Sequence, residues 1–236
     1  ATCSQTRLKI QLGLFDLFQD KRGPRVEACV NDCDEDVCLS VFCLSEHKLV
    51  ADVSNWRLNH LERVVDLLDS TAGCFPFPTD FEFLEEVDWI FDPYRIARIG
   101  GLIDADPMTG EKDVGRHVGV IETVGQRIRA YLDGRGERLK TLGGYFPLPH
   151  ELPFDPKGWK MFHESGPNGR RKAFADGVHA YVIVRELING RFAYTVGRVS
   201  EYVPFDVPLI LKRLDYFEKD APGEHWGGGD LVGGSP

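Results

Sequence analysis

The most chemically suggestive stretch of the chain is an acidic segment, Asn31 to Asp36, which reads Asn-Asp-Cys-Asp-Glu-Asp. Its crowded carboxylates repel one another, so keeping all of them ionised at one buried place is costly unless a cation lies among them. Carboxylate oxygens are the ligands that hard cations such as Mg²⁺ and Mn²⁺ prefer. We therefore expect Asp32, Asp34 and Asp36 to hold such a metal ion.

A calcium loop and a helix cap are the alternatives for the acidic segment. The calcium-loop pattern D-x-[DN]-x-[DN]-G-x₅-E fails, because Val37 stands where the glycine belongs and Cys43 where the bidentate glutamate belongs. In the second alternative the acids cap the helix that follows them, since carboxylates are stabilised near a helix N-terminus. A cap uses one or two acids, whereas this segment offers more, which favours a metal or ligand role.

The elements around the acidic segment are predicted to be a strand before it and a helix after it. A short apolar run, Val26 to Val30, precedes the acids, and an apolar pattern of helical character follows over residues 37–44. In open α/β sheets, ligands bind at such a turn at the carboxyl end of a strand. We expect residues 1–145 to form a larger α/β domain with a mainly parallel sheet. Its further helices are predicted over residues 5–19, 57–69, about 80–92, where Pro93 should break the helix, and about 118–132.

The remainder of the chain is predicted to form a smaller α+β domain over residues 159–236. A Gly- and Pro-rich linker, residues 146–158, separates it from the first domain. Two β-rich stretches flank Asn189-Gly190, a dipeptide typical of hairpin turns. Asp206 is predicted to cap a helix that has Pro208 just inside its start.

Two further features have the composition of anion-binding sites. Backbone N–H groups of a glycine-rich tail can close on a phosphate, although glycine-rich ends are also simply flexible linkers. The adjacent His225 and Trp226 favour the functional interpretation. Arg170-Arg171-Lys172 is a compact basic patch, for which a solvated turn is the default and phosphate binding the sharper hypothesis. The tail glycines are Gly227, Gly228, Gly229, Gly233 and Gly234.

Composition limits the class of protein. The net charge of −9 argues against a general binder of long nucleic acids but not against an enzyme that meets phosphate esters through metal ions. No apolar run approaches the roughly 18 residues of a membrane-spanning helix. The six cysteines contain no C-x-x-C pair, so we expect reduced core residues of a cytoplasmic protein. A zinc or redox role for Cys33 or Cys38 is the alternative.

Two of these patches together resemble the DHH/DHHA1 phosphoesterase superfamily. The stretch VNDCDEDVCLSVFCL is similar to that family's first motif, in which a strand ends in a D-x-D turn before a helix, and WGGGDLVGGSP resembles its C-terminal glycine-rich loop. The Asp-His-His triplet that defines the family is not present. The resemblance implies a metal-binding domain followed by a smaller substrate-binding domain.

The resemblance also implies roles for single residues. Asp32, Asp34 and Asp36 would bind Mn²⁺ or Mg²⁺, with Asn31 nearby, and the tail glycines would hold the substrate's phosphate. Asp52, Asp69 and His117 are candidates for further ligands, although no motif supports them. His117 opens a helix after an acidic loop, and a capping or surface role is the alternative for it.

Together these observations predict a metal-dependent phosphoesterase that acts on a small phosphorylated molecule or nucleotide between its two domains. A non-catalytic relative that binds a nucleotide or anion is the first alternative, with the acidic segment then serving structure. A protein-interaction module, which owes its solubility to its acidity, is the second.

Overall fold

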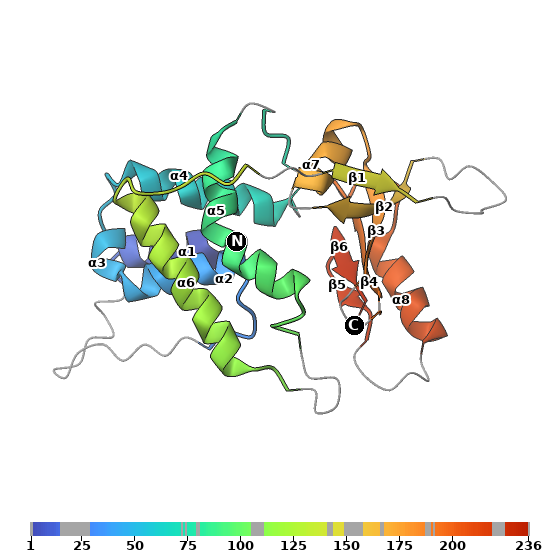
Figure 1. The fold of residues 1–236 in the computed structure, drawn as a ribbon, viewed down its shortest axis with the longest axis horizontal. Coiled ribbons are helices and arrows are strands. Elements are labelled where there is room, and N and C mark those ends of the chain that lie inside the picture. The colour runs from blue at the N-terminus through green and yellow to red at the C-terminus, as the bar shows by residue number, and fades with distance from the viewer. Residues whose placement is uncertain are drawn as a thin grey trace. The chain divides into compact units, whose positions relative to one another are not determined.

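The chain divides into two compact units. Unit 1 comprises Ala1–Ser70 and Phe81–Leu139, and unit 2 comprises Thr71–Asp80 and Lys140–Pro236. The sequence places the division at residues 146–158, whereas the structure places it between Leu139 and Lys140. The structure is a computed structural model (Figure 1), and it describes residues 2–14, 29–71, 73, 75–78, 81–104, 111–140, 144–148, 158–165, 168–186, 190, 192–218 and 225–235.

The secondary structure of unit 1, within its described residues, consists of helices joined by turns and coil. The sheet expected there is not found, and all six strands of the described chain belong to unit 2. Of the predicted strand at Val26 to Val30, residues 26–28 lie outside the described residues, while Cys29 and Val30 are exposed and form no strand. The helices of unit 1 are α1 (Thr2–Gln11), α2 (Glu35–Ser45), α3 (His47–Val50), α4 (Trp56–Ser70), α5 (Phe83–Ile99) and α6 (Val114–Leu132).

Apolar spacing explains how these helices form one core. Helix α2 packs against α1, α4 and α6, and α5 packs along α6 (Figure 1). Each contributes the stripe of side chains that recurs every three or four residues along a helix. In α4, the stripe is the one that the sequence predicts, and it is buried: Leu58, Leu61, Val64, Val65 and Leu68.

Pro93 does not end its helix, contrary to the prediction. It lies inside α5, which continues to Ile99. A proline has no backbone N–H, so the carbonyl four residues earlier, that of Trp89, loses its helical donor. The guanidinium of Arg127, from α6, donates a hydrogen bond to that carbonyl. A long-range contact therefore satisfies the oxygen that proline leaves free.

Unit 2 contains a mixed sheet, and the prediction of a mainly parallel sheet is wrong. Within the described residues, the strand order is β1-β2-β3-β4-β6-β5. Strands β2 and β3 pair in parallel through the crossover helix α7 (Asn168–Ala175), and the other neighbours are antiparallel. The strands are β1 (Gly144–Pro147), β2 (Lys160–Ser165), β3 (Ala180–Glu186), β4 (Phe192–Arg198), β5 (Gly227–Gly228) and β6 (Val232–Gly234).

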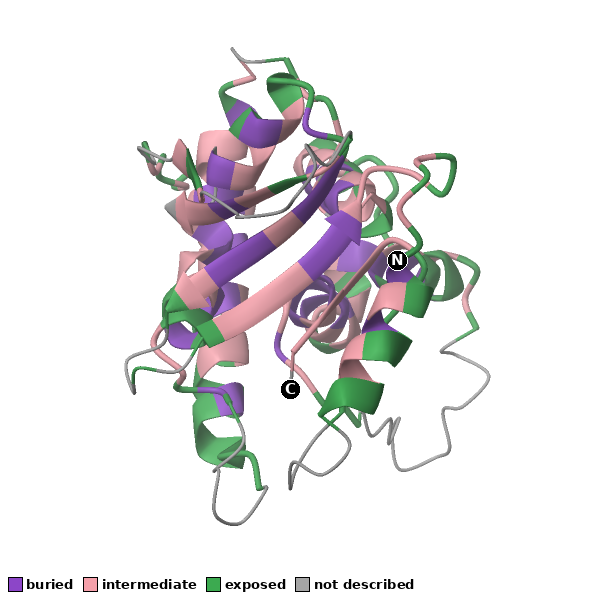
Figure 2. Cartoon of the chain, turned by 90° about the vertical axis from the view of Figure 1, so that its right-hand side faces the viewer, coloured by how far each residue is buried: buried purple, intermediate pink, exposed green. Residues whose placement is uncertain are grey.

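Helices cover both faces of this sheet. Side chains alternate along a strand, so Tyr181 and Ile183 of β3 face one side and Val182 faces the other. The first two join a buried cluster with Ala173 of α7. Val182 packs with Val196 and with the buried side of helix α8 (Val207–Phe217). Figure 2 shows the resulting burial along the central strands.

The helix α8 begins as the sequence predicts. Asp206 is its N-cap and accepts a hydrogen bond from the backbone N–H of Leu209, and Pro208 lies in the first turn. Among the described residues, no helix has the length and apolar character needed to cross a bilayer.

Candidate metal centre

The carboxylates of the acidic segment do not gather around one point. Asp34 is the N-cap of α2, and its side chain accepts a hydrogen bond of 2.8 Å from the backbone N–H of Val37. Burial raises the pKa of Asp34, although that hydrogen bond opposes the rise. The capping role that the sequence offers as an alternative therefore applies to Asp34.

Asp36 accepts hydrogen bonds from the start of a different helix, α1. Its two oxygens accept hydrogen bonds from the backbone N–H groups of Thr2, at 2.8 Å, and Cys3, at 3.0 Å, at the start of α1. Burial alone would raise the pKa of Asp36, but the hydrogen bonds from Cys3 and Thr2 outweigh it and lower the pKa below its ordinary value. Because both oxygens are engaged by α1, we do not retain Asp36 as a metal ligand.

Glu35 is paired with an arginine. Its carboxylate accepts from Arg95 of α5 at 2.7 and 3.0 Å, and the same guanidinium donates to the buried Asp88 at 2.6 Å. Three of the four acids are thus engaged within the fold: Asp34 and Asp36 accept hydrogen bonds at the starts of two helices, and Glu35 forms an ion pair. Asp32 accepts a hydrogen bond of 2.7 Å from the backbone N–H of Cys33 and, within the described part of the chain, has no other hydrogen-bond partner, so it is the carboxylate left for a ligand.

Asp32, Cys33 and His117 form the candidate metal centre. One donor atom of each, a carboxylate oxygen, the thiol sulfur and a ring nitrogen, lies within 4.8 Å of the other two. Cys33 and His117 are buried, and Asp32 is half-buried. Oxygen, sulfur and nitrogen donors at this spacing are typical of the ligands of a transition metal.

His117 lies in the first turn of α6. Asp113 caps that helix, and its backbone carbonyl lies 3.0 Å from Nδ1 of the imidazole. The other ring nitrogen, Nε2, is buried and has no hydrogen-bond partner among the described residues, and His117 as a whole is only 8% exposed. Buried polar atoms without partners are rare and costly, and a metal ion would satisfy this one.

The surroundings of Cys33 favour the protonated thiol, because they raise its pKa. Burial, together with the charges of Asp32 and Asp34, raises its pKa to about 11, while the nearby ammonium of Lys112 opposes the rise. An activated nucleophilic cysteine shows the opposite shift and is partly exposed. Cys33 is fully buried, so the group does not have the character of a cysteine-nucleophile site. A bound metal ion would instead deprotonate the thiol on coordination.

Packing and one long-range contact bring the centre together. Helix α2, which begins just after Cys33, packs against α6. In addition, Nζ of Lys112, immediately before the Asp113 cap, donates a hydrogen bond of 3.0 Å to the backbone carbonyl of Asn31. The packing of α2 on α6 and the Lys112 hydrogen bond therefore hold the acidic segment and the start of α6 together.

The remaining predicted site residues lie elsewhere. Asp52 is exposed and accepts hydrogen bonds from the backbone and hydroxyl of Ser54 at 2.9 and 2.6 Å. Arg170 and Arg171 lie in α7, not in a turn, and the backbone N–H of Arg170 donates to Glu164 at 3.0 Å. His225 is exposed, with Nδ1 2.8 Å from the carboxylate of Asp215.

The tail glycines have a structural role. Gly227, Gly228, Gly233 and Gly234 form the strands β5 and β6, in which their backbones pair with each other and with β4. A Cβ on Gly234 would lie 2.7 Å from the carbonyl oxygen of Tyr194, closer than side chains approach. Glycine is therefore required there by the close packing of strands. Gly229 donates its backbone N–H to the carbonyl of Val232 across the β5–β6 turn.

Among the centre's residues, the sequence identifies Asp32 and His117, whereas Cys33 enters it only as an alternative. The position of Cys33 directly after Asp32 is the one signal in the sequence that points to it. Comparisons of the chain with protein-family models, with curated proteins and with solved structures gave no match in any of the three. The resemblance to the DHH/DHHA1 superfamily therefore rests on the sequence patches alone.

Proposed function

We propose that unit 1 is a metal-binding unit that takes up Zn²⁺ through Asp32, Cys33 and His117. The observation that carries this proposal is that His117, whose buried Nε2 has no partner among the described residues, has a ring nitrogen within 4.8 Å of the Cys33 thiol and of an Asp32 carboxylate oxygen. Without a metal ion, the fold would leave a buried polar atom unsatisfied at a place where two further ligands converge.

The donor set favours zinc over the Mg²⁺ or Mn²⁺ expected from the acidic segment. Zinc accepts thiolate, imidazole and carboxylate together, whereas the harder cations prefer oxygen alone. In a tetrahedral site with metal–ligand distances of about 2.0–2.3 Å, ligand atoms lie about 3.3–3.8 Å apart. The donor atoms lie within 4.8 Å of one another, so the three side chains would have to move closer together on binding the ion.

Metal-assisted hydrolysis of a phosphoester is the second candidate function. Three protein ligands leave a fourth position, where catalytic zinc sites bind a water molecule whose pKa falls to about 7. Asp32 is half-buried, so the centre would lie near the surface, whereas Cys33 and His117 are buried. Lys112, held at the carbonyl of Asn31, supplies a positive charge beside the centre that suits a phosphate oxygen.

Isothermal titration of the metal-free protein with Zn²⁺, Mn²⁺ and Mg²⁺ tests the proposal. We expect one zinc ion per chain, and we expect Cys33→Ser and His117→Ala each to weaken its binding by about a hundredfold or more. Cys43→Ser, which changes another buried thiol, and His179→Ala, at an exposed histidine, are matched controls that should keep the affinity.

Two results would overturn the metal-site proposal. One is zinc binding that survives both ligand substitutions with circular dichroism showing an intact fold. The other is tight Mn²⁺ or Mg²⁺ binding that depends on Asp34, which would restore the oxygen-only site expected from the sequence. If zinc binds but a panel of phosphomonoesters and phosphodiesters is not turned over, the second candidate function fails while the first stands.

A further inference from the structure

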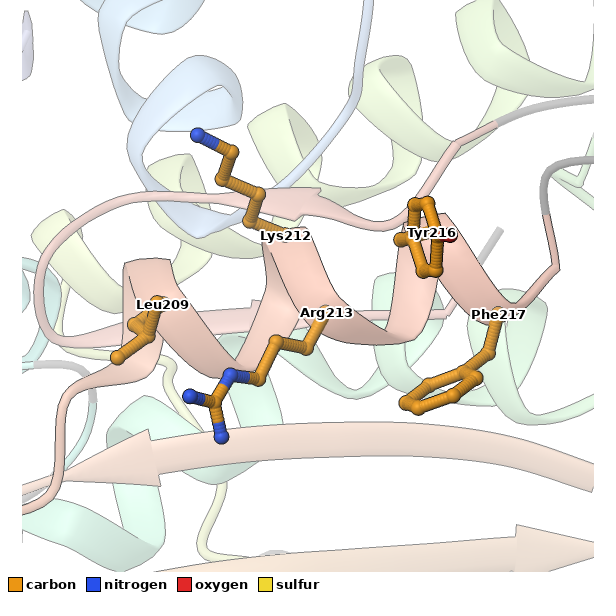
Figure 3. A pocket seen from close by; sticks show the side chains of 5 residues that line it. All are labelled: Leu209, Lys212, Arg213, Tyr216 and Phe217. Carbon is orange, nitrogen blue, oxygen red and sulfur yellow. The ribbon is translucent and has the colours of Figure 1, made fainter.

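The outer face of α8 carries a stripe of exposed side chains. Its five residues follow one another at helical spacing and line a groove of about 420 Å³ (Figure 3). Residues three and four apart lie on the same face of a helix, so the five side chains form one continuous surface. We call this surface the α8 stripe: Leu209, Lys212, Arg213, Tyr216 and Phe217.

The opposite face of α8 already anchors the helix. Val207 and Leu211 are buried against Val196 of the sheet, with other apolar side chains packed around them. The α8 stripe therefore adds nothing to the core, yet Phe217 is 80% and Tyr216 67% exposed. Exposed aromatic side chains grouped on one surface are typical of a site for a binding partner.

The charges of α8 are divided between two sides. The helix's acids have partners in the chain, because Asp215 pairs with His225 and Glu218 accepts a hydrogen bond of 2.6 Å from the indole of Trp226. Lys212 and Arg213 form neither an ion pair nor a side-chain hydrogen bond with any residue that the structure describes. On a chain of net charge −9, the α8 stripe is thus a local basic and aromatic surface.

We propose that the α8 stripe binds a short acidic peptide segment of a partner protein. An apolar side chain of that segment would lie in the groove between Leu209 and Phe217, and flanking carboxylates would pair with Lys212 and Arg213. Charge complementarity supports this occupant, because two uncompensated cations flank an apolar floor.

The size of the surface points to the same occupant. From Leu209 to Phe217 the helix rises about 12 Å, which matches two turns of a partner helix or about four extended residues. Nucleic acid and anionic membranes are bound through broad basic surfaces, which the net charge of the chain opposes. Two cations are enough for a short acidic segment.

Fluorescence polarisation with the full chain and three labelled peptides tests the proposal. The first peptide alternates Glu with Leu and Phe, the second replaces Glu by Lys, and the third replaces Leu and Phe by Ser. We expect the acidic–apolar peptide to bind at least roughly tenfold more tightly than either of the others.

Substitutions locate the binding on the α8 stripe. The double variant Lys212→Glu/Arg213→Glu and the variant Phe217→Ala should each weaken the acidic–apolar peptide by roughly tenfold. Lys172→Glu and Tyr202→Ala change an exposed lysine and an 87% exposed tyrosine elsewhere in unit 2, and they should leave the affinity unchanged. All these side chains are exposed, so circular dichroism should show the same fold.

The proposal is overturned if the acidic–apolar peptide binds no better than the other two, or if the stripe variants bind it as tightly as the parent chain. It is also overturned if phosphatidylserine vesicles or oligothymidine bind the chain and lose that binding with Phe217→Ala while the peptide does not bind. Self-association in sedimentation, abolished by the same variant without peptide binding, would instead make the α8 stripe a contact between copies of the chain.

Discussion

Replacing Asp36 by alanine should destabilise unit 1 by removing the acceptor at the start of α1. The carboxylate accepts from the N–H groups of Thr2 and Cys3. Loss of an N-terminal cap costs about 0.5–2 kcal/mol, and hydrogen bonds to a charged group are worth about 1.5–3 kcal/mol. Thr2 is exposed and regains water in the variant, whereas Cys3 is buried and does not. We therefore expect a loss of about 2–3 kcal/mol.

The pH dependence of this loss follows from the lowered pKa of Asp36. A carboxyl group whose pKa is lower in the folded than in the unfolded state stabilises the fold above the unfolded value, near 3.9, and that stabilisation disappears as pH falls through the folded value. The difference in unfolding free energy between the parent chain and Asp36→Ala should therefore be constant near neutral pH. It should shrink below about pH 4.

Urea unfolding followed by the helical signal of circular dichroism measures both effects. Glu122→Gln is the matched control, because Glu122 is an exposed acid on α6, and it should change stability by less than about 0.5 kcal/mol. An Asp36→Ala variant as stable as the control at neutral pH would refute the capping role. A stability difference that grows on acidification would refute the direction of the pKa shift.

Three further substitutions have defined outcomes. Arg95→Met leaves the 2%-exposed Asp88 side chain without its guanidinium and should cost about 3–5 kcal/mol in urea unfolding. Gly197→Ala places a methyl group against the ring of Tyr181 and should lower the melting temperature of unit 2 by several degrees, at a cost of about 1–3 kcal/mol. Gly119→Ala, where the added Cβ meets nothing within 4 Å on the exposed face of α6, should raise stability by about 0.5–1 kcal/mol.

The features of the fold that local patterns determine were predictable. The apolar stripe of α4 and the Asp206 cap of α8 are set within a few residues of sequence, and both are confirmed. The antiparallel pair β3 and β4 lies where the hairpin is predicted. Gly190 has the positive φ of 73° that the turn requires, while Asn189 lies outside the described residues.

The errors concern features that distant contacts determine. The continuation of α5 through Pro93 depends on an arginine from α6, which no local pattern reveals. The apolar run ending at Val30 suggested a buried strand, yet Val30 is 45% exposed, because a short apolar run carries no information on whether anything covers it. The parallel sheet inferred from that run was wrong for the same reason.

In the candidate metal centre, too, local sequence determines some features and distant contacts determine the others. The sequence contains too many acids for one cap, and this was the basis for expecting a metal ion. The structure instead distributes three of the four over two helix starts and one arginine, since α1 and α5 approach α2 from elsewhere in the chain. Cys33 and His117, the proposed sulfur and nitrogen ligands, become neighbours only when α6 packs beside α2.

X-ray absorption at the zinc edge of the zinc-loaded chain tests the central claim most directly. Coordination by Asp32, Cys33 and His117 predicts one sulfur at about 2.3 Å with nitrogen and oxygen neighbours at about 2.0–2.2 Å, and Cys33→Ser should remove the sulfur shell. A first shell made only of oxygen and nitrogen in the parent chain, or a sulfur shell that persists in Cys33→Ser, would contradict the proposed centre.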